Sequence, residues 1–336
     1  MKAIAYTRHG LPIADPQALV EIDLPTPEPG PRDLRVRVHA VSVNPVDTKV
    51  RRNMPTEGPR VLGWDAVGIV DAVGAEVGLF RPGERVWYAG SIARPGSNAQ
   101  YQLVDERIVG HAPTSLDDAA AAALPLTAIT AWELLFERLG VAEDGGEGQV
   151  LLVVGAAGGV GSILVQLARR LTRLTVVGTA SRAETRDWVQ ALGAHHVIDH
   201  REPLTDGLKR LGIAQVPLVA GLTHTDAHYP QIVEALAPQG RFALIDDPAE
   251  LDVRLLKRKS VSLHWEFMFT RALFETGDMF EQHRLLERVA ALVDAGTLRS
   301  TLGEHYGAIT AENLRRAHAL IESGRARGKI VLEGFG

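Results

Sequence analysis

The sequence predicts a two-domain α/β protein, in which a β-rich domain precedes a doubly wound parallel sheet. Short runs with strand periodicity fill the first ~120 residues, separated by prolines and glycines. From Gln149 onward, apolar runs alternate with helical patterns, and a glycine-rich turn joins the first run to the first helix. The chain has 336 residues, whereas single domains usually contain about 100 to 200. It is therefore long enough for two cores.

Charge and residue inventory exclude several classes of function. The formal net charge is -5, whereas nucleic acids and anionic membranes select basic faces. The chain contains no cysteine, which excludes disulfides, thiolate nucleophiles and cysteine-based metal sites. No run reaches the ~18 uncharged apolar residues that span a bilayer, and the first residues lack a secretory signal. We expect a cytoplasmic protein without a nucleic-acid or membrane partner.

The order of predicted elements places the domains. Strands at 34–41 and 67–73, with Pro/Gly turns between them, predict a barrel-like domain over residues 1–125. An alanine-rich helix over 116–135, with Ser115 as its expected N-cap and Asp117 and Asp118 in its first turn, marks the passage to the second domain. That domain is predicted over 126–269. The segment from about 270 to 336, with two helices and a last strand at 329–332, completes the first domain.

The second domain is predicted from alternating strands and helices. We expect strands at 150–154, 175–178, 196–198, 216–220 and 241–245, and helices at 161–170, 183–192 and 232–236. Continuous apolar strands with helices between them are typical of a parallel sheet buried on both faces.

A glycine-rich turn is the strongest chemical motif in the chain. It follows the strand at 150–154, opens the next helix, and has the sequence Gly155-Ala156-Ala157-Gly158-Gly159-Val160-Gly161. Glycines at such a turn let the backbone approach a pyrophosphate, whose charge then lies at the helix N-terminus. The preceding strand, the following helix and a second strand about 20 residues later favour dinucleotide binding over a purely structural turn. The residues predicted to bind are Ala156, Gly158, Gly159, Val160 and Gly161.

The end of the second strand discriminates between the two nicotinamide dinucleotides. NAD sites usually place Asp or Glu there, whereas this chain has Ser181 and Arg182 and no acid until Glu184. Arg182 can pair with a 2′-phosphate and Ser181 can donate to it, so NADPH is favoured over NADH. His200 and Lys329 are further candidate phosphate partners. The alternative for Arg182 is an ordinary solvated arginine in a first helical turn.

At this point the residues match a family. Val43-Asn44-Pro45-Val46-Asp47, Leu126-Thr127-Ala128, the glycine-rich turn and Gly328-Lys329-Ile330-Val331-Leu332 resemble the quinone-oxidoreductase branch of the medium-chain dehydrogenases/reductases, over nearly the whole chain. The most similar members are often labelled zinc-type alcohol-dehydrogenase-like. The resemblance implies a GroES-like catalytic domain followed by a Rossmann domain. It also implies a homodimer joined at the edges of the nucleotide-domain sheets.

The zinc ligands of the superfamily's alcohol dehydrogenases are absent from the matching positions. Those enzymes use a cysteine, the histidine of a Gly-His-Glu motif and a second cysteine or acid. This chain has Ser42 to Asn44 at the first position and Trp64 in Gly63-Trp64-Asp65 where the histidine would be. His224 and His228 are a lone pair without a third ligand. We therefore predict no metal, and reduction of an activated acceptor through hydrogen bonding instead of a Lewis acid.

The resemblance also assigns roles to individual residues. Asn44 and Asp47 would face the nicotinamide end of the cleft, and Thr127 would contact the nicotinamide or its ribose. Lys49 stands where related quinone reductases often have tyrosine, so it is a candidate for stabilising a developing enolate or phenolate. For Asn44 and Asp47 the alternative is a turn or cap role, and for Lys49 a solvated surface side chain. A flat aromatic substrate pocket is predicted from Trp64, Tyr88, Trp265 and Phe267.

Four functions remain open on the sequence. The favoured one is a zinc-independent, NADPH-dependent reductase of quinones or conjugated carbonyl compounds. A 2-alkenal or enone double-bond reductase would use the same hydride step. A non-catalytic NADPH-binding protein would bind the cofactor without turnover. A zinc-dependent alcohol dehydrogenase would need ligands that the sequence does not offer at the expected positions.

Overall fold

The computed structural model describes residues 1–335, which form two compact units. Unit 1 consists of Met1–Ile129 and the segment from Phe269 onward, and unit 2 of Thr130–Met268. The predicted fold class is confirmed, because unit 1 is β-rich and unit 2 contains one parallel sheet between helices. The chain passes from unit 1 to unit 2 after Ile129 and back after Met268, whereas the sequence predicted domains over residues 1–125 and 126–269.

Two sheets form most of unit 1. Its strands are β1 (Lys2–Tyr6), β2 (Val20–Asp23), β3 (Asp33–Val43), β4 (Arg60–Val61), β5 (Ala66–Val73), β6 (Arg85–Tyr88), β7 (Tyr101–Asp105), β8 (Val109–His111), β15 (Leu302–His305) and β16 (Lys329–Glu333). The small sheet has the order β2-β1-β4, and the larger has β15-β16-β3-β5-β6-β8, with β7 also paired to β3. In β3, alternate side chains such as Leu34, Val36 and Val38 are buried, which explains its strand period.

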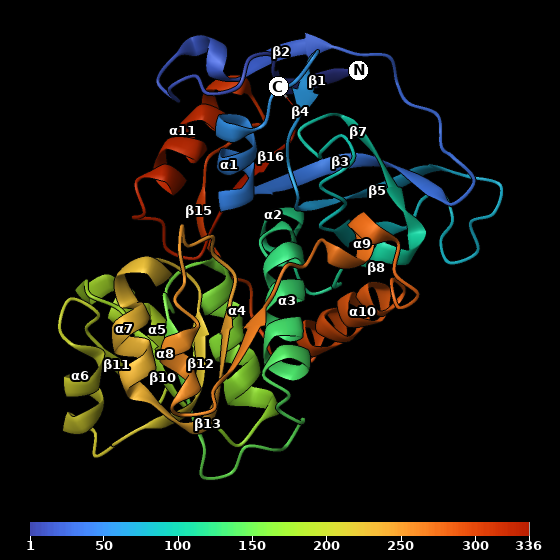
Figure 1. The fold of residues 1–336 in the computed structure, drawn as a ribbon. Coiled ribbons are helices and arrows are strands. Elements are labelled where there is room, and N and C mark those ends of the chain that lie inside the picture. Colours follow the sequence, from blue (N-terminus) through green and yellow to red (C-terminus); the bar gives the residue numbers. More distant parts are fainter. Residues whose placement is uncertain (336) are drawn as a thin grey trace. The chain divides into compact units, whose positions relative to one another are not determined.

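Helices cover the sheets of unit 1 and connect their strands. They are α1 (Pro45–Asn53), α2 (Asp118–Ala122), α9 (Thr270–Phe274), α10 (Glu281–Asp294) and α11 (Ala311–Glu322), with short 3-10 turns η1 (Pro16–Ala18) and η2 (Glu106–Ile108). Figure 1 shows α1 beside α11, where Arg51 forms an ion pair with Glu322. The C-terminal strand β16 pairs antiparallel with β3, so the last segment of the chain completes this unit.

The predicted helix over 116–135 is interrupted, and its predicted N-cap was wrong. The cap of α2 is Asp117, whose carboxylate accepts a hydrogen bond from the Ala120 N–H at 2.7 Å. Ser115 instead donates its backbone N–H to Asp294 at 2.8 Å. The chain then bends before Pro125, which begins α3 (Pro125–Trp132), because proline fits the first turn of a helix where no N–H is needed. A π-helical turn, η3 (Glu133–Arg138), follows.

By length and composition, one helical stretch in the described residues is apolar enough to cross a membrane. It comprises Asp118–Arg138, and 83% of its most apolar window is buried within the protein. The stretch contains the charged residues Asp118, Glu133, Glu137 and Arg138, so it does not contradict the expectation that no run of ~18 uncharged apolar residues exists. The core helix of a soluble protein has the same properties, and the burial observed here fits that explanation.

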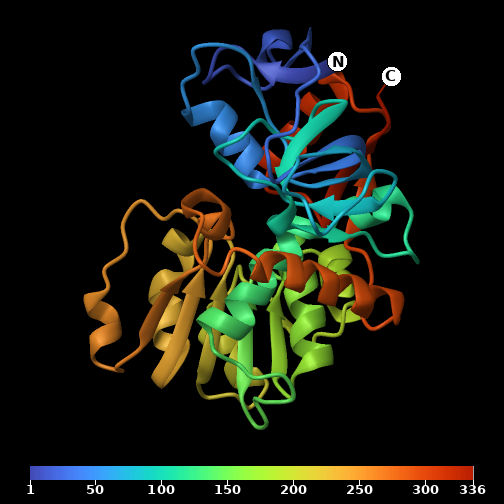
Figure 2. The same ribbon diagram turned by 90° about the vertical axis from the view of Figure 1, so that its right-hand side faces the viewer.

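Unit 2 contains a six-stranded sheet in which every pair of neighbours is parallel. Its elements are β9 (Val150–Val154), α4 (Gly159–Leu171), β10 (Thr175–Thr179), α5 (Ala183–Ala191), β11 (His196–Ile198), α6 (Leu204–Arg210), β12 (Val216–Gly221), α7 (Thr225–Ala235), β13 (Leu236–Leu244), α8 (Arg254–Lys257) and β14 (Ser262–Trp265). The strand order is β11-β10-β9-β12-β13-β14. Seen in the view of Figure 2, helices accompany the strands of this sheet.

This strand order determines where ligands can bind to unit 2. The chain moves outward from β9 to β11 and then returns to β12 on the other side of β9. In doubly wound sheets, ligands bind beyond the carboxyl ends of the strands at such a reversal. The glycine-rich turn after β9 lies at this point, and β10 and β12 are its neighbours.

A glycine inside β5 provides a test of the packing of unit 1. A Cβ atom at Gly68 would lie 2.2 Å from the Arg37 carbonyl oxygen and 2.7 Å from Val36 Cγ1. Gly68→Ala should therefore lower the thermal unfolding midpoint, by the equivalent of about 1 to 3 kcal/mol. Gly58→Ala is the matched control, because no atom lies within 4 Å of its Cβ position. Equal midpoints for the two variants would contradict this packing.

Candidate functional site

A buried polar cluster lies in unit 1, where β3, α1, β16 and the β4–β5 connection meet. We call Ser42, Asn44, Asp65 and Lys329 the Asp65 cluster, and none of them is more than 3% exposed. Asp65 Oδ2 accepts three hydrogen bonds: from the Lys329 ammonium at 2.9 Å, from Asn44 Nδ2 at 2.8 Å and from Ser42 Oγ at 3.2 Å. The cluster brings together residues more than 200 positions apart in the sequence.

Asn44 occupies the N-cap of α1, and its side chain is held on both sides. Its Oδ1 accepts a hydrogen bond from the Lys329 ammonium, and its Nδ2 donates to Asp65 and, at 3.3 Å, to the Trp64 carbonyl. Because an ammonium can only donate, the carbonyl end of the amide must face Lys329. Asn44 therefore stands at the cap position, which was the alternative to a role at the nicotinamide, and its amide orientation is fixed.

Asp47 lies in the first turn of the same helix and is 1% exposed. Its Oδ2 accepts the Asn44 backbone N–H at 2.7 Å. Burial raises the pKa of Asp47 to about 7, while that N–H and the Lys329 ammonium act in the opposite direction. A carboxyl group with this pKa can hold or release a proton near neutral pH.

Lys329 was predicted to contact a phosphate, but the structure places it in the Asp65 cluster. Its side chain is 3% exposed, and its ammonium donates to Asp65, to Asn44 and, at 3.2 Å, to the Val43 carbonyl. An ammonium has three donors, so these three acceptors use all of them. The sequence could not show this pairing because Asp65 precedes Lys329 by 264 residues.

Asp65 was not among the predicted site residues, yet it connects this cluster to α3. Its Oδ1 accepts the Leu126 N–H at 2.7 Å, at the start of the helix that carries Thr127. Burial raises the pKa of Asp65, and Lys329, the Leu126 N–H and Asn44 lower it. A lone acid in the apolar run from Val61 to Val67 was the available sequence signal, because buried acids are normally paired.

The other predicted residues of unit 1 differ in their surroundings. Thr127 is 2% exposed and donates to the Leu124 carbonyl at 3.1 Å. Lys49 lies on the surface of α1. Trp64 and Tyr88 have no exposed surface; the Trp64 indole donates to the Ser91 carbonyl at 3.2 Å, and burial raises the pKa of Tyr88. Trp64 and Tyr88 are therefore core residues of unit 1.

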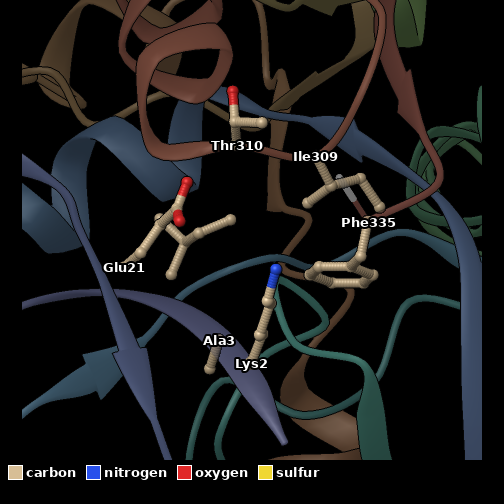
Figure 3. Close-up of a pocket in the computed structure, with 7 residues that line it drawn as sticks. Lys2, Ala3, Glu21, Ile309, Thr310 and Phe335 are labelled. Carbon is tan, nitrogen blue, oxygen red and sulfur yellow. The ribbon is translucent and has the colours of Figure 1, made fainter.

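Two cavities in unit 1 are lined by none of the predicted residues. The lining side chains of the first cavity, shown in Figure 3, include Lys2, Glu21, Ile309, Thr310 and Phe335. A second lies between the 91–94 loop, β7 and the α9–α10 connection.

In unit 2, the glycine-rich turn has the backbone geometry expected for close approach to a ligand. Gly155 has φ +89°, which favours glycine, and its N–H donates to Thr179 Oγ1 at 3.0 Å. Gly158 is the N-cap of α4, and Gly159 and Val160 form the first turn. A Cβ atom at Gly161 would lie 2.5 Å from the Gly155 carbonyl oxygen, so the helix packs against the turn without room for a side chain. Ala156 is buried at this contact.

A basic cluster lies beyond the neighbouring strands β10 and β11. It comprises Arg182, Arg186 and Arg201, of which Arg182 follows Ser181 in the sequence and Arg201 contacts it. Arg201 donates to the Ser181 carbonyl at 3.1 Å and to Asp199 at 2.6 Å, and Arg186 donates to Asp199 at 2.9 Å. These hydrogen bonds, that of Arg201 first, lower the pKa of Asp199. Sequence analysis found only Arg182 and missed Arg186 and Arg201. The available signal was that Arg186 lies one helical turn after Arg182 and that Arg201 follows the next strand.

His200 adjoins this basic cluster and contacts a second histidine. Its ring centroid lies 5.9 Å from that of His228, and burial lowers the pKa of both side chains. Within residues 1–335, no three His, Cys, Asp or Glu side chains are arranged to hold a metal ion. Trp265 and Phe267, at the end of β14, are 52% and 46% exposed.

Comparison with known proteins places this geometry in a family. Residues 30–114 match the alcohol dehydrogenase GroES-like domain, and residues 192–332 match a family described as zinc-binding dehydrogenase. A zinc-type alcohol dehydrogenase-like protein of Staphylococcus aureus is 42% identical over 311 residues, covering 92% of both chains. The chain belongs to the medium-chain dehydrogenase/reductase superfamily. The predicted resemblance is confirmed, and by family the protein is an oxidoreductase.

Other members of the superfamily match along nearly the whole chain. The quinone oxidoreductase of Lama guanicoe is 29% identical over 341 residues, covering 99% of this chain and 97% of that protein. A Rhizobium etli crystal structure, provisionally assigned as a zinc-dependent alcohol dehydrogenase, has a TM-score of 0.97 at 57% identity and covers 100% and 98% of the two chains. A mycobacterial structure with NADPH has a TM-score of 0.85 at 27% identity and covers 99% of each chain.

The buried carboxyl group of Asp47 makes the stability of this medium-chain dehydrogenase/reductase depend on pH. Its folded-state pKa of about 7 exceeds the value of about 3.9 of an unfolded chain. The folded protein then binds more protons between these values, so stability falls as pH rises from about 4 to about 7, by up to about 4 kcal/mol. Asp47→Asn removes this dependence and can still accept the Asn44 N–H.

We expect the thermal unfolding midpoint of Asp47→Asn, measured relative to the unsubstituted protein, to be higher at pH 8 than at pH 5. The other titrating groups are common to the two proteins, so their effect cancels in the difference between the two midpoints at each pH. A difference between the two proteins that does not change with pH would show that Asp47 titrates normally.

Proposed function

We propose that this protein is an NADPH-dependent reductase that transfers hydride to a quinone or conjugated carbonyl acceptor without zinc. The observation that carries the proposal is the basic cluster near Ser181, next to a glycine-rich turn that opens α4. The three arginines of this cluster outnumber the two carboxylates that pair with them, Asp199 and Glu184. The excess positive charge matches a 2′-phosphate, which NADPH has and NADH lacks.

The residues present fit a nicotinamide dinucleotide. Gly161 lets α4 pack directly against the turn after β9, and the Gly159–Val160 turn offers helix N–H groups to a pyrophosphate. Ser181, Arg182 and Arg201 would hold the 2′-phosphate, with His200 beside them. Thr127 is a proposed contact of the nicotinamide or its ribose. When bound, NADPH supplies the hydride.

The chain's own groups favour an activated acceptor. Asn44 and Asp47 are the proposed residues at the acceptor, and Asp47 can hold the proton that the reduced oxygen needs near neutral pH. The acid at the position of the zinc enzymes' Gly-His-Glu glutamate, Asp65, is engaged by Lys329, and the histidine position is Trp64. Polar side chains such as those of Asn44 and Asp47 favour stabilisation of a developing oxyanion by hydrogen bonds.

The location and assembly of the protein also remain proposals. β14 lies at the edge of the unit 2 sheet, with Trp265 and Phe267 exposed beside it. An unpaired strand edge with exposed aromatic residues suits edge-to-edge pairing with a second copy. We therefore retain the homodimer, together with the cytoplasmic location that the composition predicted.

Loss of nicotinamide absorbance tests the proposed reaction. NADPH and NADH should each be offered a quinone, an enone, an aldehyde and a simple ketone, with and without a metal chelator. We expect chelator-insensitive turnover of quinone or enone that prefers NADPH, and the faster acceptor separates quinone from double-bond reduction. NADPH binding without turnover would indicate a non-catalytic binding protein, and chelator-sensitive turnover limited to aldehyde or ketone a zinc-dependent alcohol dehydrogenase.

Arg182→Ala tests the phosphate site. Loss of a charge-assisted contact to the phosphate should weaken NADPH binding roughly tenfold or more and leave NADH binding nearly unchanged. Cofactor fluorescence titration measures both. Arg173→Ala is the control, since Arg173 is an exposed arginine of unit 2 that pairs with Glu147. An unchanged preference for NADPH in Arg182→Ala would remove the main argument for this cofactor.

A further inference from the structure

Asp65 has more hydrogen-bond donors than its role as the partner of Lys329 requires. Its side chain has no exposed surface, and four donors from three separate segments of the chain converge on it. Leu126 N–H reaches Oδ1, whereas the Ser42 hydroxyl, the Asn44 amide and the Lys329 ammonium reach Oδ2. A carboxylate is the side chain that can accept on both oxygens at once. Asparagine would direct an NH₂ group at one of these sets of donors.

These hydrogen bonds fix the two segments of unit 1 to which site residues were assigned. At the first segment, Asp65 and Lys329 together orient the Asn44 amide, and the Asn44 backbone N–H in turn donates to Asp47. At the second, the Leu126 N–H is one of the first-turn donors of α3 that have no partner within the helix. Asp65 therefore sets where α3, and with it Thr127, begins relative to α1.

We propose that Asp65 is a positioning residue for the reductase reaction, because its carboxylate holds the start of α1 and the start of α3 in one fixed geometry. The inference rests on the proposed function. Asp65 itself is buried beneath Asn44 and Leu126 and need not contact cofactor or substrate. Its effect is on Asn44, Asp47 and Thr127, whose relative positions decide whether hydride and proton transfer are aligned, and small misplacements of such groups are costly.

Loss of any buried carboxylate can destabilise a protein, so the test needs a matched control. Glu106 supplies one in the same unit. It is 2% exposed and likewise joins separate segments, accepting the Gly78 and Leu79 N–H groups at 2.8 and 2.9 Å and pairing with Arg32. None of these residues belongs to the Asp65 cluster. Glu106→Gln therefore reports the general effect of neutralising a buried carboxylate in unit 1.

The experiment compares Asp65→Asn, Asp65→Glu and Glu106→Gln with the unsubstituted protein, each well below its unfolding midpoint. Hydrogen exchange of backbone amides is followed by mass spectrometry in peptides that cover residues 42–50 and 122–132. NADPH affinity, kcat and KM for the best acceptor of the panel are measured on the same samples. Asp65→Glu retains the charge facing Lys329 but moves the carboxylate by one methylene, so it separates charge from position.

We expect Asp65→Asn to exchange faster in both peptides and to lose about tenfold or more in kcat, whereas Glu106→Gln stays within about twofold of the unsubstituted protein. Asp65→Glu should recover most of the lost stability but not the lost kcat. If Asp65→Asn does not fold, Asp65→Glu carries the test by the same two measurements. Full recovery of kcat and of slow exchange in Asp65→Glu would assign Asp65 a purely electrostatic role and overturn the proposal.

Failure of this proposal is distinguishable from failure of the proposed function. An unsubstituted protein that neither binds NADPH nor reduces any acceptor contradicts the proposed function, and the exchange measurement still reports on Asp65. Normal turnover in the unsubstituted protein, with Asp65→Asn matching Glu106→Gln in kcat and in exchange at both peptides, contradicts the positioning role alone.

Discussion

A buried ion pair between Asp65 and Lys329 is the interaction on which the polar interior of unit 1 depends. Each charge loses its water on burial, at an effective cost of several kcal/mol, and only a full set of partners offsets this. Both residues meet that condition, since Lys329 has three acceptors and Asp65 four donors. The same need for partners fixes Asn44, the start of α3 and the first residue of β16. Stability and site geometry in this unit therefore have one physical cause.

In unit 2 the controlling constraint is steric instead of electrostatic. Gly155 and Gly161 permit a helix to begin directly against a strand, which leaves backbone N–H groups directed beyond the sheet. The charged groups lie beyond the neighbouring strands, where Asp199 accepts hydrogen bonds from Arg186 and Arg201. A phosphate at the start of α4 would meet neutral N–H donors, whereas a phosphate near Arg182, Arg186 and Arg201 would meet guanidinium groups.

Local patterns predicted most elements of the fold, and the failures have physical reasons. Strands β9 to β12 were predicted to within one residue, because a parallel strand buried on both faces is a continuous apolar run. The start of β13 was placed five residues too late, and β14 was not predicted, because this edge strand is only partly buried and is not an apolar run. The cap of α2 was assigned to Ser115 instead of Asp117, because both residue types cap helices and the choice depends on Asp294, far along the chain. Trp64 and Tyr88 were expected in a pocket, but burial of aromatic side chains depends on packing that the sequence pattern does not show.

The sequence by itself determined the fold class, the superfamily, the glycine-rich turn and the absence of cysteine ligands, because each of these depends on residues that are close together in the chain. Tertiary structure decided the partners of the charged residues. It assigned Lys329 to Asp65 instead of to a phosphate, added Arg186 and Arg201 to Arg182, and made a site residue of Asp65. Charge pairing acts between atoms a few ångströms apart whatever their separation in sequence, so only the folded chain shows which charges meet.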